Sequence, residues 1–457
     1  MTQMSAGQTL LIAGGRVIDP ANGLDTVADV LIENGLIAAV GSGLSARAST
    51  SSSEKVTLLD AKGLVVAPGF IDLHTHLREP GYDYKETIET GTLAAARGGF
   101  TTVCAMPNTD PPMDSRATID YVMQRAVATG IVRVLPIGCV TKGRAGQQLA
   151  ELGELAAAGC VGFSDDGSPI ADAAIMRRAL EYASGFGLPV IDHCEDPRLG
   201  GGVMHEGWVA TRLGLRGIPA SSEETAVARD LALAKQTVAH VHIAHLSTAG
   251  SVDLVRRAKA EGMRVSAEVT PHHLVLTHEA VMYRGAAAAS DSDRGVLAFD
   301  TAAKMYPPLR SAEDVEACVE GLAEGTIDAI ATDHAPHAVQ EKLCEFDISE
   351  FGMVGLETAL PLALSTGLPL ERIVEALTIG PVRALGLDRH VKGIGTLAVG
   401  SPADVVLFEP TRDWAVEPEA LASKGKNTPL IGKSLRGRVV ATLYGGRVVH
   451  ALERVAV

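Results

Sequence analysis

Two histidines separated by a single residue open the part of this sequence that could do chemistry. His74 and His76 lie in the run GFIDLHTHLREPG, residues 69–81, after an apolar start. In a strand, side chains two residues apart point to the same side with Cα atoms roughly 6.6 Å apart, which suits two ligands of one metal ion. Histidine is the commonest nitrogen ligand of zinc-like ions. Because the chain has 14 histidines, the pair gains weight only from the residues that accompany it.

Further metal-competent residues stand at the ends of other short apolar segments. They are Asp165 and Asp166, His193, His245 and Asp333. Surface residues scattered at random would not follow segment ends in this way. In the run HVHIAHLS, His245 comes last, whereas His240 and His242 come earlier and face the opposite way, which favours packed or surface roles for them. We expect His272 and His273, which follow another segment, in supporting or structural roles.

Four histidines and two carboxylates exceed what one tetrahedral zinc requires. They suit two ions that share a carboxylate and hold a water or hydroxide between them, with the ions roughly 3.5–4 Å apart. Such a site lowers the pKa of the bound water from 15.7 to about 7, so that hydroxide is available near neutral pH. A neighbouring carboxylate can take the proton of that water and return it to a departing nitrogen. Asp333, in the run ATDHAPH, is the candidate for this acid/base role.

Strand-like and helical segments alternate through the middle of the chain. Strands are expected near residues 70–76, 101–107, 132–140, 160–166, 189–195, 241–247, 264–270 and 328–334. A helical period of 3.6 residues occupies 85–97, 114–128, 171–184, 222–236, 249–261 and 312–323. Eight such strands predict an α/β fold of the (β/α)8 TIM-barrel type, in which functional side chains gather at the C-terminal ends of the strands. An open doubly wound sheet is the main alternative, but no Gly-x-Gly-x-x-Gly follows a strand here.

Both ends of the chain read as β-structure. Residues 30–33 and 36–40 flank Asn34-Gly35, and this pair tolerates the positive φ angles of a two-residue hairpin turn. A strand is expected at 404–408, and 438–444 turns at Gly445-Gly446 into 447–450. Neither end is long enough to bury a sheet alone. We therefore predict a composite β-sandwich domain from residues 1–66 and 390–457 beside a barrel of residues 67–389.

Composition narrows the class of protein. A net charge of -15 argues against a broad nucleic-acid surface. The six cysteines show no Cys-x-x-Cys spacing and suit a reducing cytosol. The first residues lack the basic start and long apolar run of a signal peptide, and no window holds the roughly 18 apolar residues of a membrane span. We expect a cytoplasmic protein that binds neither nucleic acid nor membrane.

The motifs resemble the amidohydrolase superfamily and, within it, the class I dihydroorotases. The resemblance covers nearly the whole chain. It rests on GFIDLHTHLREPG, GGFTTVCAMPNT (98–109), GFSDDGSP (162–169), DHCED (192–196), HIAHLST (242–248), PPLR (307–310), ATDHAPH (331–337) and FGMVGLETALP (351–361). The superfamily as a whole shares the His-x-His motif, whereas HLREPG with MPNT and TDHAPH is more specific.

The resemblance implies the roles of individual residues. One zinc would be held by His74, His76 and Asp333, and a second by His193 and His245. Asp166 and a water or hydroxide would bridge the two ions, and Asp333 would be the catalytic acid/base. Implied substrate contacts are His76, Leu77, Arg78, Asn108, His337, Phe351 and Gly352. Arg78 and Asn108 make chemical sense as a clamp on a substrate carboxylate.

The implied activity is dihydroorotase, the reversible cyclisation of N-carbamoyl-L-aspartate to (S)-dihydroorotate and water in pyrimidine (UMP) biosynthesis. The alternatives are another cyclic amidohydrolase (hydantoinase, dihydropyrimidinase or allantoinase) and a non-catalytic scaffold for aspartate transcarbamoylase. The first group generally bridges its metals with a carboxylated lysine from the fourth strand, where this chain offers Asp166. A scaffold would be expected to lack ligands that are all present here. A homodimer and an association with the transcarbamoylase are both compatible with the resemblance.

Two features depart from the pattern or stand outside it. Before PPLR many relatives carry an asparagine that contacts substrate, and this chain has Tyr306. A phenol donates one hydrogen bond but cannot copy an amide, so the exchange bears on substrate affinity and identity. The stretch 277–304 follows the seventh strand and contains GAAAASDSDRG. We expect it to form a loop, either a lid over the site or a solvent-exposed connection.

Overall fold

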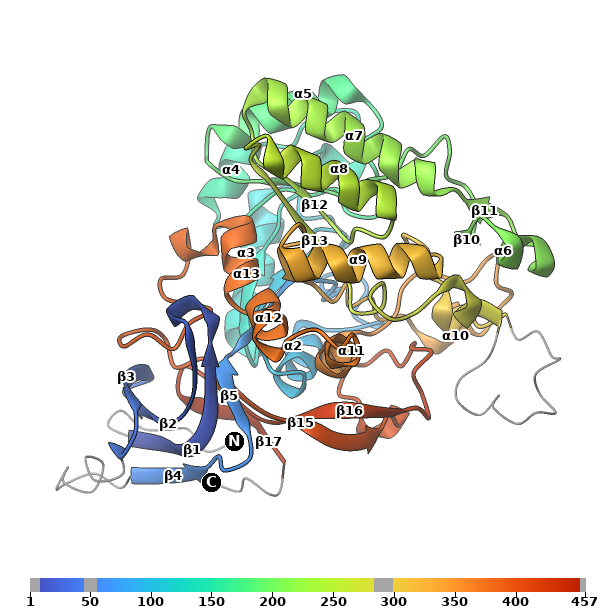
Figure 1. The fold of residues 1–457 in the computed structure, drawn as a ribbon. Coiled ribbons are helices and arrows are strands. Elements are labelled where there is room, and N and C mark those ends of the chain that lie inside the picture. Colours follow the sequence, from blue (N-terminus) through green and yellow to red (C-terminus); the bar gives the residue numbers. More distant parts are fainter. Residues whose placement is uncertain (1–8, 45–55, 283–298, 453–457) are drawn as a thin grey trace, which may run out of the picture.

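Short parallel strands in the middle of the chain form a ring that helices surround (Figure 1). The computed structural model describes residues 9–44, 56–282 and 299–452. One parallel sheet contains β6 (Phe70–Thr75), β7 (Phe100–Ala105) and β8 (Arg133–Pro136). Another contains β9 (Val190–Asp192), β12 (Val241–Ile243), β13 (Val265–Val269) and β14 (Ala329–Ile330).

Single parallel bridges join these two sheets into a closed barrel. Phe163 pairs with Gly138 after β8 and with Val190 of β9, and Thr75 of β6 pairs with His334 after β14. The predicted (β/α)8 barrel is thereby confirmed. Its fourth strand, expected at 160–166, is short and centres on the two bridges of Phe163. The backbone N–H groups of Val161 and Ser164 donate to the carbonyls on one side, and that of Phe163 donates to Pro189 on the other. Beyond these bonds, the Asp165 carboxylate accepts the N–H groups of Val140 and Thr141.

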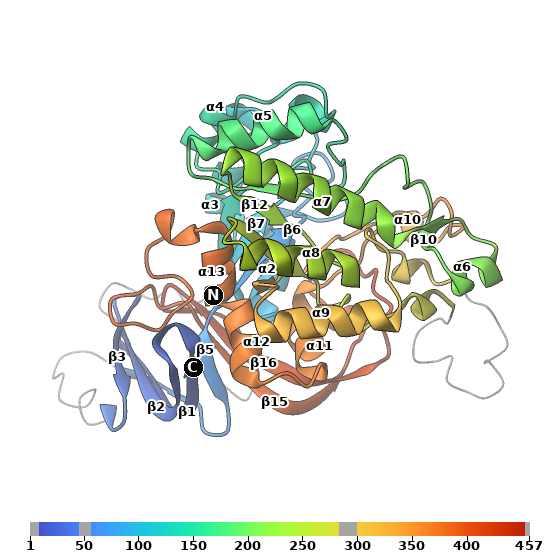
Figure 2. The ribbon, with the colours of Figure 1, turned by 45° about the horizontal axis from the view of Figure 1, so that its top comes forward.

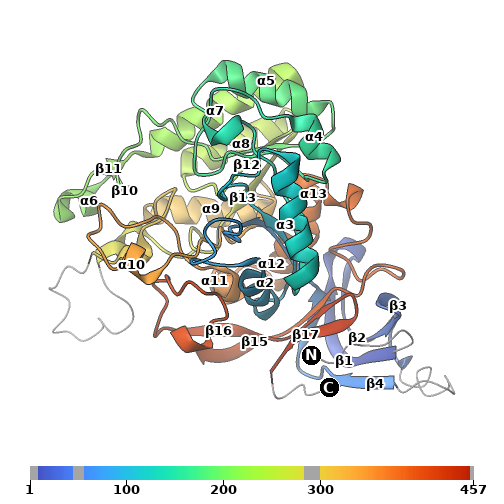
Figure 3. The same ribbon diagram turned by 180° about the vertical axis from the view of Figure 1, so that it is seen from behind.

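Helices cover the outside of the ring, and Figures 1 and 3 show α5, α7, α8 and α9 on one side and α2 and α3 on the other. Side chains of the residues before five of these helices cap their first free N–H groups, as Ser and Thr do at 87, 115, 248 and 311. All six predicted helices are present. They are α2 (Ile88–Arg97), α3 (Arg116–Thr129), α5 (Ala173–Ser184), α7 (Ala220–Thr237), α8 (Ala249–Ala260) and α9 (Ala312–Glu324).

Shorter elements complete the barrel domain. Figure 2 shows α6 with β10 projecting from its edge, near α10. The shorter helices are α4 (Leu152–Ala157), α6 (Trp208–Leu213), α10 (Val339–Lys342), α11 (Ala359–Ser365), α12 (Leu370–Leu377) and α13 (Ile379–Leu385), and the short strands are β10 (Met204–His205) and β11 (Gly217–Ile218). No helix in the described ranges is both long and apolar enough to span a membrane.

Strands from the two ends of the chain share one sheet of eight strands, in the order β17-β16-β15-β5-β1-β2-β3 with β4 paired to β1. The predicted joining of both ends is confirmed. Because β5 both pairs with β15 and leads directly into β6, it ties the sheet to the barrel. The strands are β1 (Thr9–Asp19), β2 (Leu24–Glu33), β3 (Leu36–Gly41), β4 (Val56–Asp60), β5 (Val65–Pro68), β15 (Val405–Ala415), β16 (Ser434–Tyr444) and β17 (Arg447–Ala451).

The sheet folds back on itself until its two hairpin turns touch. Asn34 and Gly35 have φ angles of 54° and 76°, as the predicted turn requires. A Cβ added at Gly446 would lie 2.9 Å from the Cα of Gly35, so both turns need the small residue they have. The fold encloses an apolar cluster that includes Leu10, Val30 and Val405. The bounds at 66 and 390 and the description as a sandwich stay predictions, and β5 itself crosses residue 66.

The long loop predicted at 277–304 is described only at its two ends. Short 3-10 helices lie at His278–Met282 and Thr301–Ala303. Residues 283–298 lie outside the described part of the chain. The prediction that this loop forms a lid or a solvent-exposed connection falls on these residues and stays a prediction.

Candidate metal centre and active site

The first two histidines point into the barrel rim from the end of β6. His74 Nε2 lies 3.3 Å from Asp166 Oδ1 and 3.5 Å from Asp333 Oδ1. His76 Nε2 lies 3.0 Å from the same oxygen of Asp333 and 3.5 Å from Asp166 Oδ2. The spacing of two in a strand therefore presents both imidazoles to the same pair of carboxylates.

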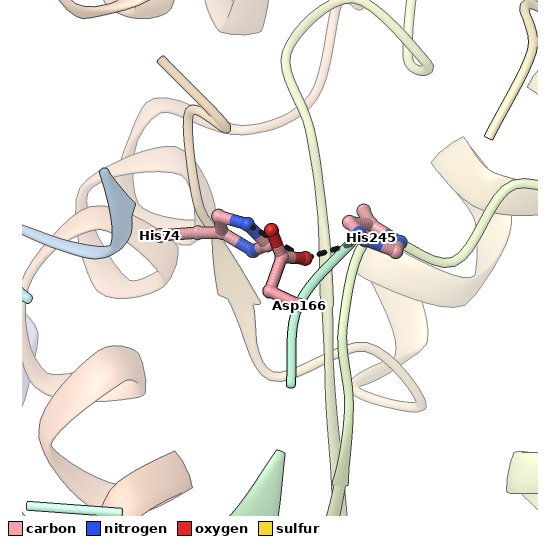
Figure 4. A group of neighbouring side chains, drawn as sticks. All are labelled: His74, Asp166 and His245. Carbon is pink, nitrogen blue, oxygen red and sulfur yellow. Dashed lines mark ion pairs between the residues drawn. The ribbon is translucent and has the colours of Figure 1, made fainter. Parts of the chain in front are cut away.

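Asp166 lies at the centre of the remaining donors. His193 Nδ1 and His245 Nε2 are each 3.5 Å from its Oδ1 atom, and Figure 4 shows the carboxylate between His74 and His245. All four residues are nearly inaccessible to solvent. One oxygen of Asp166 thus faces three imidazoles, and its second oxygen faces His76.

Three of these ring nitrogens are buried without a hydrogen-bond partner in the described part of the chain: His74 Nε2, His193 Nδ1 and His245 Nε2. A buried polar atom that makes no hydrogen bond costs stability unless something else engages it. All three nitrogens face the same carboxylate oxygen of Asp166. Two groups of three residues, which share His74, have donor atoms close enough together to hold one ion each. The first group is His74, Asp166 and His245, and the second is His74, His76 and Asp333. Nitrogen and carboxylate donors in this number fit a pair of zinc-like cations.

The electrostatics favour ionised carboxylates. Burial alone would raise the pKa of Asp166 and of Asp333, but the facing histidines outweigh it and lower both pKa values. Burial, with His245 close by, lowers the pKa of His193, so that this imidazole is neutral and keeps a lone pair. Anionic oxygens and neutral imidazoles are the forms in which these groups bind metal ions.

The neighbouring Asp165, which strand-end position alone did not separate from Asp166, has a different task. Its Oδ1 accepts the N–H groups of Val140 and Thr141 at 2.9 and 3.1 Å, and the hydroxyl of Thr141 donates to its other oxygen. Asp165 therefore joins two barrel segments, while Asp166 faces the histidines.

The other histidines lie outside the group, as expected. His240 Nε2 and His242 Nδ1 both lie 2.8 Å from Ser266 Oγ, below the rim. His273 lies 2.8 Å from Thr270 Oγ1 and 3.2 Å from the carbonyl of Pro307. His272 is buried with its Nε2 unbonded in the described residues, and burial together with His273 lowers its pKa well below the usual value.

A cavity of about 410 Å³ opens beside the histidines. Its wall contains most of the expected substrate contacts: His76, Arg78, Asn108, His337, Phe351 and Gly352. Leu77 is the exception, because its side chain is buried in the hydrophobic core and lies against Gly91 of α2. The expected substrate contact from Leu77 stays a prediction, and the side chain of Leu77 takes no part in this wall.

Arg78 is held in the wall by uncharged partners. Its Nε atom donates to the carbonyl of Pro336 at 3.3 Å, and one terminal nitrogen lies 3.4 Å from His337 Nε2. The carboxylates next to it in sequence are engaged elsewhere, Glu79 with Arg125 and Glu86 with Ser423. The guanidinium therefore keeps N–H groups for a ligand.

Asn108 connects the cavity wall to the histidines. His76 Nδ1 donates to its amide oxygen at 2.7 Å, and its amide nitrogen lies 3.4 Å from Asp166 Oδ2. The first bond places the proton of His76 on Nδ1 and directs the lone pair on Nε2 toward the carboxylates. Asn108 thus orients a candidate ligand in addition to lining the cavity.

Tyr306 fills the wall with its ring and turns its hydroxyl away. The hydroxyl donates to Glu195 at 2.5 Å. Its ring centroid lies 4.5 Å from that of His193 and 5.1 Å from that of Phe351. Burial and the nearby Glu195 raise the pKa of the phenol, so it stays protonated. Tyr306 therefore shapes the cavity but does not offer it the two hydrogen-bonding groups of an amide.

Sequence reasoning missed several residues of the site, and Arg144 and Glu268 are the two with direct bonds to candidate ligands. Arg144 lines the cavity and donates to the carbonyl of Asp166 and to the hydroxyl of Ser168. Its signal was weak, because it lies in a loop after a strand whose end was uncertain. Glu268 lies 2.9 Å from His74 Nδ1. A glutamate inside the buried strand VSAEV was a readable signal, since such a carboxylate needs a buried partner.

Comparison with known proteins identifies the family. A family model described as dihydro-orotase-like matches residues 63–251, and one described as amidohydrolase family matches residues 353–450. A curated dihydroorotase from Anaeromyxobacter sp. (strain K) is 52% identical over 96% of this chain and 98% of its own. Another from Geobacter sp. (strain M21) is 51% identical over 96% of this chain and 99% of its own.

Solved structures show the same architecture in more distant proteins. An L-hydantoinase (dihydropyrimidinase) from Arthrobacter aurescens superposes with a TM-score of 0.83 at 26% identity, and covers 98% of this chain and 97% of its own. A dihydropyrimidinase from Brevibacillus agri superposes with a TM-score of 0.79 at 24% identity over 97% and 95% of the two chains, which speaks for the fold alone. The much higher identity to the curated sequences decides the narrower assignment: this chain belongs to the dihydroorotase family of amidohydrolases.

Proposed function

We propose that this protein is a dihydroorotase, which interconverts N-carbamoyl-L-aspartate and (S)-dihydroorotate plus water in pyrimidine synthesis. The observation that supports it most is the combination of a candidate two-metal donor set with a cavity that holds Arg78. The substrate carries a carboxylate that survives the reaction, and Arg78 makes no ion pair with any carboxylate in the described ranges.

The proposed cofactor is a pair of zinc ions. His74, His76 and Asp333 would hold one ion, His193 and His245 the other, and Asp166 would bridge them. Three buried nitrogens without hydrogen bonds around Asp166 support this assignment. When bound, the ions would supply a water of lowered pKa and would polarise the amide carbonyl.

Asp333 would move the proton of the reaction. In hydrolysis, water adds to the ring amide carbon and the C–N bond breaks. One proton of the water reaches the ring nitrogen, and the other is released to solvent as the new carboxylate forms. A carboxylate of low pKa, next to His76 at 3.0 Å, can accept the proton of the attacking water and pass it to the leaving nitrogen. Ring closure is the same path in reverse.

The part of the cavity wall around Arg78 would bind the retained carboxylate of the substrate. Arg78 and Asn108 would donate to it, and the segment Phe351–Gly352 would complete the contact. His337 supports this end, because its Nε2 donates to the carbonyl of Phe351 at 2.8 Å. Burial, together with Arg78, lowers the pKa of His337, so the imidazole adds no charge next to the guanidinium.

The alternative within the class is a hydantoinase or dihydropyrimidinase, which the solved structures of the same fold represent. Those substrates need carry no carboxylate, so Arg78 would have nothing to pair with. A purely structural partner of aspartate transcarbamoylase would not need six convergent metal donors. A homodimer, and association with a transcarbamoylase in addition to catalysis, stay predictions.

The test combines metal analysis with one substitution. We expect about two zinc ions per chain by elemental analysis and hydrolysis of dihydroorotate by the native protein. Asp333→Ala should abolish turnover. Robust turnover by that variant would remove Asp333 from its role, and turnover of hydantoin without dihydroorotate would move the protein to the alternative.

A further inference from the structure

A row of buried polar side chains continues inside the barrel beneath the candidate metal ligands. It starts at His74 Nδ1, 2.9 Å from Oε1 of Glu268. The other oxygen of Glu268 lies 3.2 Å from Nε2 of His242. His242 Nδ1 lies 2.8 Å from Ser266 Oγ, and the Ser266 hydroxyl donates to the carbonyl of Ala384 at 2.9 Å. None of the four polar side chains is more than 5% exposed, so bulk water does not compete for these bonds.

The strands dictate this arrangement. Ser266 and Glu268 are two residues apart on β13, so both side chains point to the same side. His242 of β12 pairs directly with Ser266. The carbonyl of Ala384, on α13, closes the row at the bottom of the barrel. Each member is therefore held by backbone elements of the barrel itself.

The direction of each hydrogen bond follows from the lower end. A carbonyl can only accept, so the single hydroxyl proton of Ser266 is used by Ala384. The oxygen of Ser266 must then accept from His242 Nδ1. The contact between His242 Nε2 and Glu268 Oε2 needs one proton, which is bound to one of these two atoms. In either case the other oxygen of Glu268, Oε1, carries no hydrogen and can only accept. His74 must therefore donate to it from Nδ1.

This requirement decides what His74 can do at the rim. With the proton on Nδ1, the lone pair of the imidazole is on Nε2. That nitrogen faces Asp166 at 3.3 Å and Asp333 at 3.5 Å and makes no hydrogen bond within the described residues. The opposite tautomer would place a hydrogen there and leave no lone pair for a cation.

We propose that Glu268 and His242 are positioning residues that hold His74 in the metal-binding tautomer and orientation, and so set the affinity of the metal centre. The inference rests on the proposed metal centre and goes beyond its ligands. Partners that hydrogen-bond the far nitrogen of a ligating histidine typically change metal affinity or activity by about 10–100-fold when they are removed. His242 would act one step further away, through Glu268.

The experiment measures metal binding, not turnover. Metal-free protein is titrated with Zn²⁺ against a competing chelator, and with Co²⁺ while the visible absorption spectrum is recorded. We expect His242→Phe and Glu268→Leu to weaken binding by about 10–100-fold and to alter the Co²⁺ spectrum. His242→Gln keeps a donor toward Glu268 and should restore binding to within about threefold of the native protein.

His240→Phe is the matched control. His240 Nε2 also lies 2.8 Å from Ser266 Oγ, but it is not in the path to His74. Its loss should leave both Zn²⁺ affinity and the Co²⁺ spectrum unchanged. Thermal unfolding of each metal-free variant reports whether a change in binding reflects loss of the fold.

Each outcome is decisive. If the native protein binds no metal, the proposed metal centre is refuted. If the native protein binds metal and His242→Phe binds it with the same affinity, only the present inference is overturned. If His242→Phe does not fold, Glu268→Gln is compared with Glu268→Leu. The amide oxygen of Gln can still accept from His74, so we expect only the leucine variant to lose affinity, and equal losses would contradict a role in orientation.

Discussion

Removal of the Arg78 guanidinium should weaken the reaction of a substrate only if that substrate carries a carboxylate. One of its five N–H groups is used by the Pro336 carbonyl. The terminal N–H groups remain for the cavity, because the nearby His337 Nε2 already donates to Phe351, and they are enough for a two-point contact with a carboxylate. Each charge-assisted hydrogen bond contributes about 1.5–3 kcal/mol. Arg78→Met should therefore cost about 3–6 kcal/mol, a factor of about 10²–10⁴ in kcat/KM for dihydroorotate.

The assay compares two substrates in the same variant. Dihydroorotate is measured beside 5,6-dihydrouracil, which has the same ring without the carboxylate, and the native protein provides the reference for both. Arg78→Met should reduce the ratio of the two kcat/KM values by the full factor, because the ring without a carboxylate has nothing to lose. Arg177→Met, which removes an exposed guanidinium on α5 paired with Glu181, is the control for a general effect of lost charge.

The result that would refute this reasoning is an equal loss for both substrates. It would mean that Arg78 supports the fold of the wall or the histidines, and that the carboxylate binds elsewhere. Arg144, the other guanidinium in the cavity wall, would then be the next residue to substitute.

Two further predictions concern the aspartate pair and a buried lysine. Asp165→Ala leaves the N–H groups of Val140 and Thr141 without their acceptor, so it should lower the free energy of unfolding by about 1–3 kcal/mol for each of them. The metal content of this variant should stay unchanged, whereas Asp166→Ala should lose metal. Chemical denaturation and elemental analysis check this, and a metal-free Asp165→Ala protein that is as stable as the native one would contradict it. Burial, together with Lys304, lowers the pKa of Lys342 from 10.5 to about 7. Between about pH 7 and 10 the unfolded chain therefore binds a proton at this lysine that the folded chain lacks. The free energy of unfolding should rise with pH over that window. The free energy of unfolding of the native protein and of Lys342→Met is measured by chemical denaturation across this range. The native protein should gain stability relative to Lys342→Met as the pH rises. Lys235→Met, which changes an exposed lysine, is the control, and a difference that does not change with pH would disprove the lowered pKa.

Much of the fold was readable because its signals are local. Helix periodicity and the Asn34-Gly35 turn each depend on a few neighbouring residues, and both were predicted correctly. The end of the strand expected at 160–166 was less readable: its backbone bonds stop at Ser164, and beyond it the Asp165 carboxylate accepts the N–H groups of Val140 and Thr141. Pairing of this kind depends on residues that are distant in sequence.

By itself, the sequence determined which residues could do chemistry and at which strand ends they stand, since the spacing of two at His74 and His76 fixes a common direction. Residue spacing could not choose between Asp165 and Asp166; the family resemblance implied Asp166, and the structure shows Asp166 facing the histidines while Asp165 bonds backbone N–H groups. Only the tertiary structure decided that Leu77 packs in the core and that the hydroxyl of Tyr306 bonds Glu195. It also revealed the row of bonds from His74 to Ala384. The physical reason is that barrel closure brings strands hundreds of residues apart into hydrogen-bonding distance, and no local pattern records which side chains meet there.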